Sequence, residues 1–268
     1  MEKIDNILGI KVGTGVFVKK DADGREYLDF KSFDRIGRQI VQLVRIGIKP
    51  VLITSAGITA GMIRTETATR PNKKSAMPEL QRLASVGWGH LLHMWDIYTA
   101  DLTTGGLLLT RRELAVRSRE REEALKTIYA MLSHGDLPII NENDAVTHEE
   151  IAFGDNDKLA ATLIREMKRS ELFGNVLGLV MLSTVDGLYE DKNDSSTLIR
   201  VVQNIDAVRH LAYGSDYQNA AGGMVTKLDA FDILAPEGLD MWIANGREDD
   251  AIQKAMSGQI GTLFVPNR

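Results

Sequence analysis

The sequence predicts an α/β protein in which a mainly parallel β-sheet carries helices on both faces. Short apolar runs typical of buried strands alternate with segments of helical period along the whole chain. Several of these runs end in small or polar residues, as strands do where they lead into a loop at the edge of a parallel sheet. No Pro- or Ser-rich linker and no internal repeat interrupts the 268 residues, so we expect one continuous domain over residues 1–268.

In the first half of the chain, glycines and short polar segments separate the expected helices and strands. Asp21 to Gly24 lies between Val16–Val18 and Tyr27–Leu28, which predicts a small hairpin. Ser32 is expected to cap a helix that Gly47 ends, and the small residues from Thr54 to Gly61 are expected to form a turn. The other strands expected here are 7–12, 51–53, 107–109 and 137–140, and the other helices are 78–98 and 118–133.

The second half continues the alternation. The run Val176 to Leu182 predicts a central strand, and the polar segment Glu190 to Thr197 predicts an exposed loop. Ser215 to Gly223 is expected to be a loop. The remaining strands expected are 199–202, 241–243 and 261–265, and the helices are 158–168, 206–213, 224–234 and 249–256.

Residues 138–158 are the most informative stretch. The apolar run Leu137–Ile140 ends in Asn-Glu-Asn-Asp, and Gly-Asp-Asn-Asp then opens the helix that begins near Lys158. In α/β sheets, ligands bind beyond the carboxyl ends of strands and at the starts of the following helices. The alternative is a surface loop whose Asn and Asp residues cap a helix, but a cap needs one such residue and this stretch has six. The stretch therefore predicts a site for a polar small molecule.

Composition argues against several classes of function. The net charge of −5 disfavours a nucleic-acid partner, and the longest apolar run is far shorter than the roughly 20 residues of a membrane helix. The chain contains no cysteine, which excludes thiol catalysis and permits a reducing compartment. The five histidines show no metal-ligand spacing, so we expect no histidine metal site and assign no metal ligand.

Two common nucleotide signatures are incomplete. The first glycine turn lacks the third glycine of a dinucleotide fingerprint, and Gly222-Gly223 precedes Lys227 at the wrong spacing for a P-loop. Four expected strand ends nevertheless run into small or polar residues, and lysines stand at the first end and after the Gly-Gly turn. Lysines, glycine-rich loops and the nearby Asp155 and Asp157 are the ingredients of a phosphoryl-transfer site.

Six motifs, in this order, resemble those of the glutamate 5-kinases within the amino acid kinase family. The resemblance runs from about residue 7 to the closing Gly261-Thr-Leu-Phe. The motifs are Lys11-Val-Gly-Thr-Gly, Thr54-Ser-Ala-Gly-Ile-Thr-Ala-Gly, Leu108-Leu-Thr-Arg, Pro138-Ile-Ile-Asn-Glu-Asn-Asp-Ala-Val, Gly154-Asp-Asn-Asp and Gly222-Gly-Met-Val-Thr-Lys.

The resemblance implies a three-layer α/β/α sandwich that uses ATP and Mg²⁺ to phosphorylate the side-chain carboxylate of L-glutamate, the first step of proline biosynthesis. It also implies a substrate lobe over about 1–170, a nucleotide lobe over about 171–268, a cytoplasmic location, and a homodimer or homotetramer. Longer relatives carry a C-terminal PUA domain, which we do not expect within this chain. The helix 78–98, with Trp88 and Trp95, is a candidate subunit interface, although both indoles could equally be core.

The same resemblance assigns roles to individual positions. Lys11 and Lys227 would neutralise the phosphates and the transferring group, and Asp157 would hold both lysines in place. The expected ligands of glutamate are Ser55, Asp144 and Asn156, with Asp144 facing the ammonium group. The residues expected to contact the nucleotide are Gly13, Ser183, Thr184, Gly222, Gly223 and Lys227.

Some positions depart from the family pattern and keep other functions open. Ser55-Ala56-Gly57 replaces the usual Ser-Gly-Ala at the substrate turn, and Thr184 replaces the usual Asp on the nucleotide side. Residue 221, usually Thr, is Ala, and the connection 165–175 is longer than usual. One alternative is therefore a sister kinase that phosphorylates another small carboxylate, phosphonate or phosphate. Another is a non-catalytic sensor of nucleotides or amino acids, which the retained charged residues disfavour.

Overall fold

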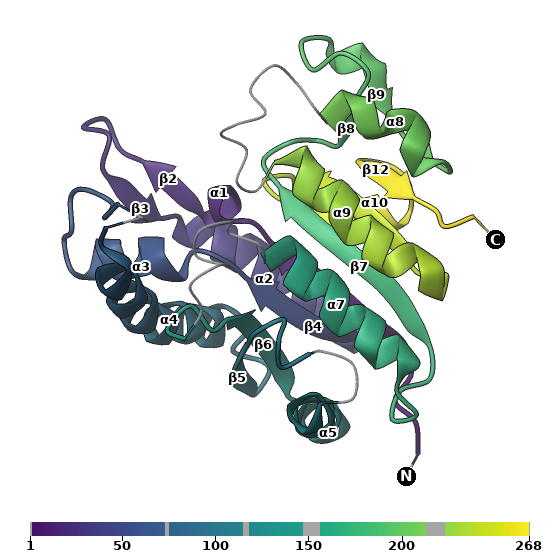
Figure 1. The fold of residues 1–268 in the computed structure, drawn as a ribbon, viewed down its shortest axis with the longest axis horizontal. Helices are drawn as coiled ribbons and strands as arrows, with labels where there is room; N and C mark the ends of the chain where they lie inside the picture. Colours follow the sequence, from purple (N-terminus) through teal and green to yellow (C-terminus); the bar gives the residue numbers. More distant parts are fainter. Residues whose placement is uncertain (1, 73–74, 115–117, 147–155, 213–222, 268) are drawn as a thin grey trace.

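The computed structural model describes residues 2–72, 75–114, 118–146, 156–212 and 223–267. Within these ranges, the central sheet has the strand order β10-β12-β11-β7-β1-β4-β6-β5, and Figure 1 shows how helices cover it. Its pairs are parallel except for β11 with β12, which confirms the predicted mainly parallel sheet. The strands are β1 (Ile7–Val12), β4 (Lys49–Thr54), β5 (Thr104–Leu109), β6 (Leu137–Glu142), β7 (Val176–Ser183), β10 (Val201–Val202), β11 (Asp240–Asn245) and β12 (Thr262–Phe264).

Helices cover both faces of this sheet and make the three layers that the sequence predicts. One face carries α5 (Arg119–His134), α7 (Asn156–Arg169) and α9 (Met224–Leu234). The other carries α2 (Phe30–Arg45), α4 (Met77–Tyr98) and α10 (Ala251–Met256). Strands covered on both faces must be apolar along their whole length, and every residue of β1 is buried.

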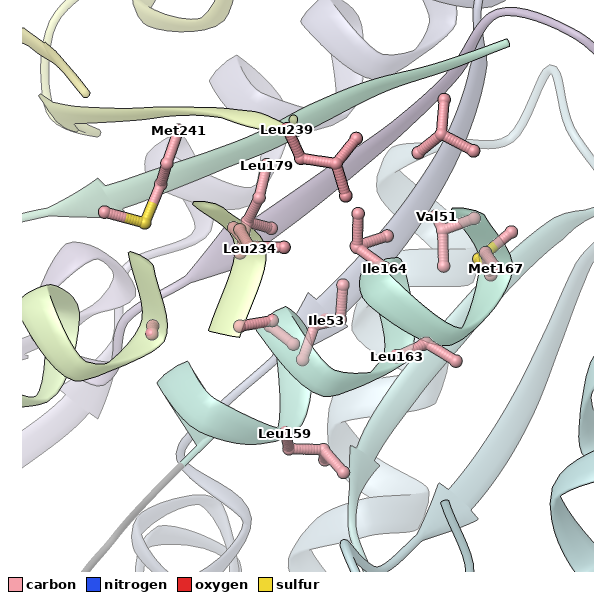
Figure 2. Packing of buried hydrophobic residues seen from close by; sticks show 14 of the residues in the cluster. Val51, Ile53, Leu159, Leu163, Ile164, Met167, Leu179, Leu234, Leu239 and Met241 are labelled. Carbon is pink, nitrogen blue, oxygen red and sulfur yellow. The ribbon is translucent and has the colours of Figure 1, made fainter. Parts of the chain in front are cut away.

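Figure 2 shows the core on the first face, where α7 lies across the sheet. Leu163, Ile164 and Met167 of the helix pack with Val51 of β4 and Leu179 of β7. These residues are at most a few per cent exposed, and burying each one contributes about 1.5–3 kcal/mol. This packing fixes the helix whose first residues are Asn156 and Asp157.

Two short helices were not predicted. Val16 and Phe17, expected in a strand, belong to α1 (Thr14–Phe17), so the hairpin consists of β2 (Val18–Lys20) and β3 (Glu26–Leu28). Both residues are fully buried, so tertiary packing overrides their strand propensity. The small-residue stretch expected to be a turn forms α3 (Gly57–Arg64).

The predicted N-cap of α2 was also wrong. The helix begins at Phe30 and follows Asp29, while Ser32 lies inside the first turn. The hydroxyl of Ser32 donates to Asp29 Oδ2 at 2.6 Å, and Lys19 Nζ pairs with the same oxygen at 2.6 Å. The carboxylate thus ties the hairpin to the start of α2.

The rest of the described chain follows the predicted order. The final strand is shorter than expected, and the predicted exposed segment 190–197 contains a 3₁₀ turn (Ser195–Thr197) between β8 (Leu188–Tyr189) and β9 (Leu198–Ile199). The strand expected over 199–202 is divided between β9 and β10, and α8 (Ile205–Ala212) follows. Trp95 is fully buried, and its indole N–H donates to Thr54 Oγ1 at 3.1 Å, so this indole is core. None of the helices in the described ranges has the length and apolar character needed to cross a membrane.

Helices α3 and α4 touch through their backbones at glycines. A Cβ added to Gly87 would lie 1.8 Å from the carbonyl oxygen of Gly57, and one added to Gly61 would lie 1.9 Å from that of Leu83. Any larger residue must therefore push the helices apart. The contact holds α3 in place and explains how a stretch of turn-forming residues is stabilised as a helix.

We expect Gly87→Ala to lower the free energy of unfolding by at least about 2 kcal/mol, because the added methyl group overpacks a backbone contact. Gly89→Ala on the same helix is the matched control, since a Cβ there meets nothing within 4 Å. The control should gain about 0.5–1 kcal/mol from helix propensity. Urea unfolding of both variants measures the difference, and equal stabilities would contradict the backbone contact.

Candidate active site

The site lies where four adjacent parallel strands end. In the order β7-β1-β4-β6 the strands point the same way, so their last residues meet at one edge of the sheet. The starts of α7 and α9, on one face of the sheet, bring Asp157 and Lys227 to the same place. This arrangement matches the edge that the sequence predicts for a small-molecule site.

Three charged side chains form a buried cluster at this edge. Lys11 Nζ of β1 pairs with Asp157 Oδ1 at 2.6 Å, and Lys227 Nζ donates to Asp157 Oδ2 at 3.0 Å. Lys11, Asp157 and Lys227 are 7%, 3% and 6% exposed, so water screens the cluster only weakly. The hydroxyl of Thr226 donates to Asp157 Oδ2 at 2.8 Å. The structure thus brings together the three residues expected to be catalytic.

Burial and charge act in opposite directions on these groups. Burial raises the pKa of the Asp157 carboxyl, but the ammonium groups of Lys11 and Lys227 and the hydroxyl of Thr226 outweigh it and hold this pKa far below its ordinary value. Burial lowers the pKa of Lys227, with Lys11 adding to this effect and Asp157 opposing it. The carboxylate is therefore ionised at every physiological pH, as a fixed counterion for two amines.

Asn156 connects α7 to the neighbouring strand ends. Its side-chain nitrogen donates to the carbonyl oxygen of Thr54 at 3.0 Å, to Ser55 Oγ at 3.1 Å and to Asn141 Oδ1 at 2.9 Å. These contacts join the ends of β4 and β6 to the first turn of α7. They bring two of the three residues expected to bind substrate, Ser55 and Asn156, into direct contact.

Asp144, the third expected substrate residue, faces the turn that follows β4. Its Oδ2 would be 3.7 Å, and Asn141 Nδ2 would be 3.2 Å, from a Cβ added to Gly57. The absence of a side chain at Gly57 leaves space between these polar groups. The preceding Ala56 has a left-handed backbone with φ of 77°, which costs a non-glycine residue about 1–2 kcal/mol. Strain of this kind often occurs at functional sites.

The residues expected on the nucleotide side lie around the ends of β1 and β7. The backbone N–H of Gly13 donates to the carbonyl oxygen of Leu182 at 2.9 Å, and Ser183 ends β7. Thr184 is exposed, and its methyl carbon would lie 2.7 Å from a Cβ on Gly15. Gly223 directly precedes α9, whereas Gly222 and Asp155 lie outside the described residues.

Two participants were not singled out from the sequence. Thr226 is next to Lys227 in its motif, and Asn141 is the first polar residue after an apolar run. Both positions were visible in the motifs, but hydrogen bonds to Asp157 and Asn156 depend on the three-dimensional contacts. Chemically, the site offers two buried amines that can bind phosphate, close to a group of amide and hydroxyl side chains.

The acid sensitivity of folding should depend on Asp157. Because its pKa is lower in the folded than in the unfolded chain, the unfolded chain takes up this proton first as the pH falls. The stability contributed by the carboxylate is complete above the ordinary pKa of about 4 and is lost below it. Between pH 5 and pH 3 the wild type should lose about 1 kcal/mol more than Asp157→Asn.

Urea unfolding at the two pH values measures this difference. Asp249→Asn is the control, since this carboxylate is exposed, and it should follow the wild type. Parallel losses in the wild type and Asp157→Asn would rule out a strongly paired carboxylate at this position.

Comparison with known proteins identifies the family of the chain. Residues 7–245 match the model of the amino acid kinase family. A glutamate 5-kinase of Clostridium acetobutylicum is 36% identical, over 97% of this chain and 95% of its own length. One of Shewanella halifaxensis is 37% identical, over 96% of this chain and 67% of its own.

Solved structures share the fold at lower identity. Carbamate kinase from Giardia lamblia bound to AMP-PNP has a TM-score of 0.64 at 15% identity, covering 98% of this chain and 99% of its own. UMP kinase from Bacillus anthracis has a TM-score of 0.61 at 16% identity, covering 98% and 97%. The sequence matches show that the chain belongs to the amino acid kinase family and, within it, groups with the glutamate 5-kinases.

Proposed function

We propose that this chain transfers the γ-phosphoryl group of ATP to the side-chain carboxylate of L-glutamate, forming L-glutamyl 5-phosphate for proline biosynthesis. The observation that carries the proposal is the buried Lys11–Asp157–Lys227 cluster beside the Ser55–Asn156 contact. The chain that contains it is 36% identical to a glutamate 5-kinase over nearly its full length.

The two lysines would neutralise negative charge on the reacting groups. A carboxylate oxygen of the acceptor attacks the γ-phosphorus, a new P–O bond forms, and the bond to the β-phosphate oxygen breaks to release ADP. Both reactants are anions, so the barrier includes their mutual repulsion, and amines held in a dry site offset that repulsion. The acceptor is already ionised, so no general base has to remove a proton from it.

The substrate side would select an amino acid. Asp144 is suited to the α-ammonium group, and the hydroxyl of Ser55 and the amide of Asn156 are suited to the carboxylates. The two side-chain N–H groups of Asn156 are shared among three protein acceptors, which holds Ser55 in place before the ligand binds, and a bound carboxylate would take the place of one of these acceptors. A site organised in advance loses less entropy when it binds.

Magnesium would enter with the nucleotide. The described residues contain no group of three His, Cys, Asp or Glu side chains able to hold a metal ion. Lysines and Thr226 occupy both oxygens of Asp157, which therefore acts as their counterion and not as a metal ligand. This donor set fits an ion held mainly by phosphate oxygens and water, which is the usual mode of Mg²⁺ in kinases. When bound, the ion would neutralise phosphate charge.

We infer the wider organisation from the motif resemblance to the glutamate 5-kinases. Residues of about 1–170 would form the substrate lobe and about 171–268 the nucleotide lobe. A homodimer or homotetramer in the cytoplasm is proposed; the exposed Ile97 on α4 supports an interface there, and the absence of cysteine is consistent with a reducing compartment.

A second acceptor is favoured by one observation. Ala56 is strained and Gly57 has no side chain beside Asn141 and Asp144, so this turn is suited to a different small carboxylate, phosphonate or phosphate. A panel of such acceptors, assayed by ADP release, distinguishes a kinase for another acceptor from a kinase for L-glutamate.

Trapping the acyl phosphate tests the proposal directly. With ATP, Mg²⁺, L-glutamate and hydroxylamine, we expect a glutamate-dependent hydroxamate. ADP release with another acceptor and no glutamyl hydroxamate would favour the sister kinase. Calorimetric binding of nucleotide with no turnover on any acceptor would favour a sensor.

Lys227→Ala should lower turnover by roughly 10²–10³, the scale for losing one donor that stabilises a transition state. Lys227→Met keeps the volume of the buried stem and should show the same loss, which separates lost charge from lost packing. Lys168→Ala, an exposed lysine of α7, is the control and should retain full turnover. Near-normal turnover in both Lys227 variants would remove this amine from the mechanism.

A further inference from the structure

Residues 245–247, which follow the buried part of β11, contact three separate segments of the chain. Asn245 ends the strand beside β7, and Gly246 and Arg247 come next. Their partners are the loop after β7; residues 13–15, which form the turn after β1 and the start of α1; and the helix α2. The first two partners carry the residues that we propose to contact the nucleotide, Ser183 and Thr184 in the loop and Gly13 in the turn.

The loop after β7 is held at two points. Asn245 Nδ2 donates to Asp186 Oδ1 at 2.9 Å, and the backbone N–H of Gly246 donates to the carbonyl oxygen of Ser183 at 2.9 Å. The hydroxyl of Tyr189 donates to the other oxygen of Asp186 at 2.7 Å. The hydrogen bonds from Tyr189 and Asn245 lower the pKa of Asp186, so the loop is fastened through an ionised carboxylate.

The turn after β1 is held by Arg247. Its guanidinium Nη2 donates to the carbonyl oxygen of Gly15 at 2.8 Å, and its backbone N–H donates to Asn245 Oδ1 at 3.0 Å. The side-chain amide of Asn245 therefore links the two contacts: its nitrogen donates to Asp186 in the loop, and its oxygen accepts from the backbone N–H of Arg247.

Gly246 fits tightly between these segments. A Cβ there would lie 2.8 Å from Val16 Cγ1 and 2.9 Å from Leu182 Cβ. Arg35 Nη2 of α2 donates to its carbonyl oxygen at 3.2 Å, so the backbone is fixed from the opposite side as well. Only a residue without a side chain permits this approach.

We propose that Asn245, Gly246 and Arg247 form a clamp that fixes the loop after β7 and the turn after β1 relative to each other, and so position the nucleotide. The three are positioning residues, since they act through Ser183, Thr184 and Gly13. Loops already held in their binding arrangement lose less entropy when a ligand binds. The inference rests on the proposed function only for the identity of the ligand as ATP.

Exposure separates this role from a purely structural one. Asp186 and Arg247 are both exposed, and hydrogen bonds at such positions contribute little to global stability. Breaking the clamp should therefore weaken nucleotide binding much more than it lowers the unfolding midpoint.

Exchanging the amide and the carboxylate tests the contact between positions 245 and 186. Asn245→Asp places two carboxylates face to face and should weaken the binding of a non-hydrolysable ATP analogue by about fivefold or more. In the double variant Asp186→Asn with Asn245→Asp, the new amide can donate to the new carboxylate, and the bonds from Tyr189 and Arg247 can persist. Its affinity should return to within about twofold of the wild type, the usual limit of additivity errors.

Asn204→Asp is the matched control. It makes the same charge change at an exposed position of the C-terminal half, where the Asn204 side chain accepts from the backbone N–H of Asp206. Aspartate serves equally well there, so binding should not change. Titration calorimetry gives the affinities, and thermal unfolding should show similar midpoints for all the variants.

The outcomes separate the clamp from the proposed reaction. Unchanged analogue affinity in Asn245→Asp, or a double variant as weak as the single one, overturns the clamp. A fall in the unfolding midpoint that accounts for the whole loss of affinity overturns it too. Wild-type analogue binding without glutamate-dependent hydroxamate overturns the proposed function and leaves the test of the clamp intact.

Discussion

The arrangement of the site depends on a single buried carboxylate. Asp157 is the common partner of Lys11 and Lys227, which come from opposite ends of the sequence. An ammonium group buried without a counterion would cost several kcal/mol, so the two lysines can remain inside only while this anion lies between them. Two cations share one anion, and the remaining positive charge in a dry site is what an anionic ligand can neutralise. The same pairing that makes burial possible thus leaves the site suited to phosphate.

The sheet was predictable because its strands are buried on both faces. Such strands read as apolar runs, and β1, β4, β6 and β7 were each recognised from them. Helix α3 was missed because its residues Gly57, Thr59 and Gly61 are typical of turns. The contact of Gly61 and Gly87 between α3 and α4 stabilises it, and such a contact leaves no periodic signal in a single segment.

The location of the site could be predicted from the sequence, but the contacts between its residues could not. Polar residues directly after apolar runs identified the edge of the sheet, because parallel strands end together. That Lys11 and Lys227 meet on one carboxylate followed from a resemblance, since no local pattern links segments so far apart. The clamp at residues 245–247 was not anticipated, because most of its hydrogen bonds reach distant partners and two of those partners are backbone carbonyls. Backbone carbonyls have the same chemistry in every residue, so the sequence carries no sign of which ones are used.

The strengths of these contacts fit the tasks we propose for them. Groups that must stay in place during phosphoryl transfer are buried, where charge interactions are strong and a small displacement is costly. The proposed clamp uses half-buried and exposed side chains, whose hydrogen bonds are weak individually and can be exchanged for water. A nucleotide has to enter and leave in every cycle, so the loops around it benefit from contacts that order them without locking them. The strongly paired lysines and the weakly fastened loops then serve one requirement, because the chemistry needs a rigid charge arrangement and turnover needs a site that releases ADP.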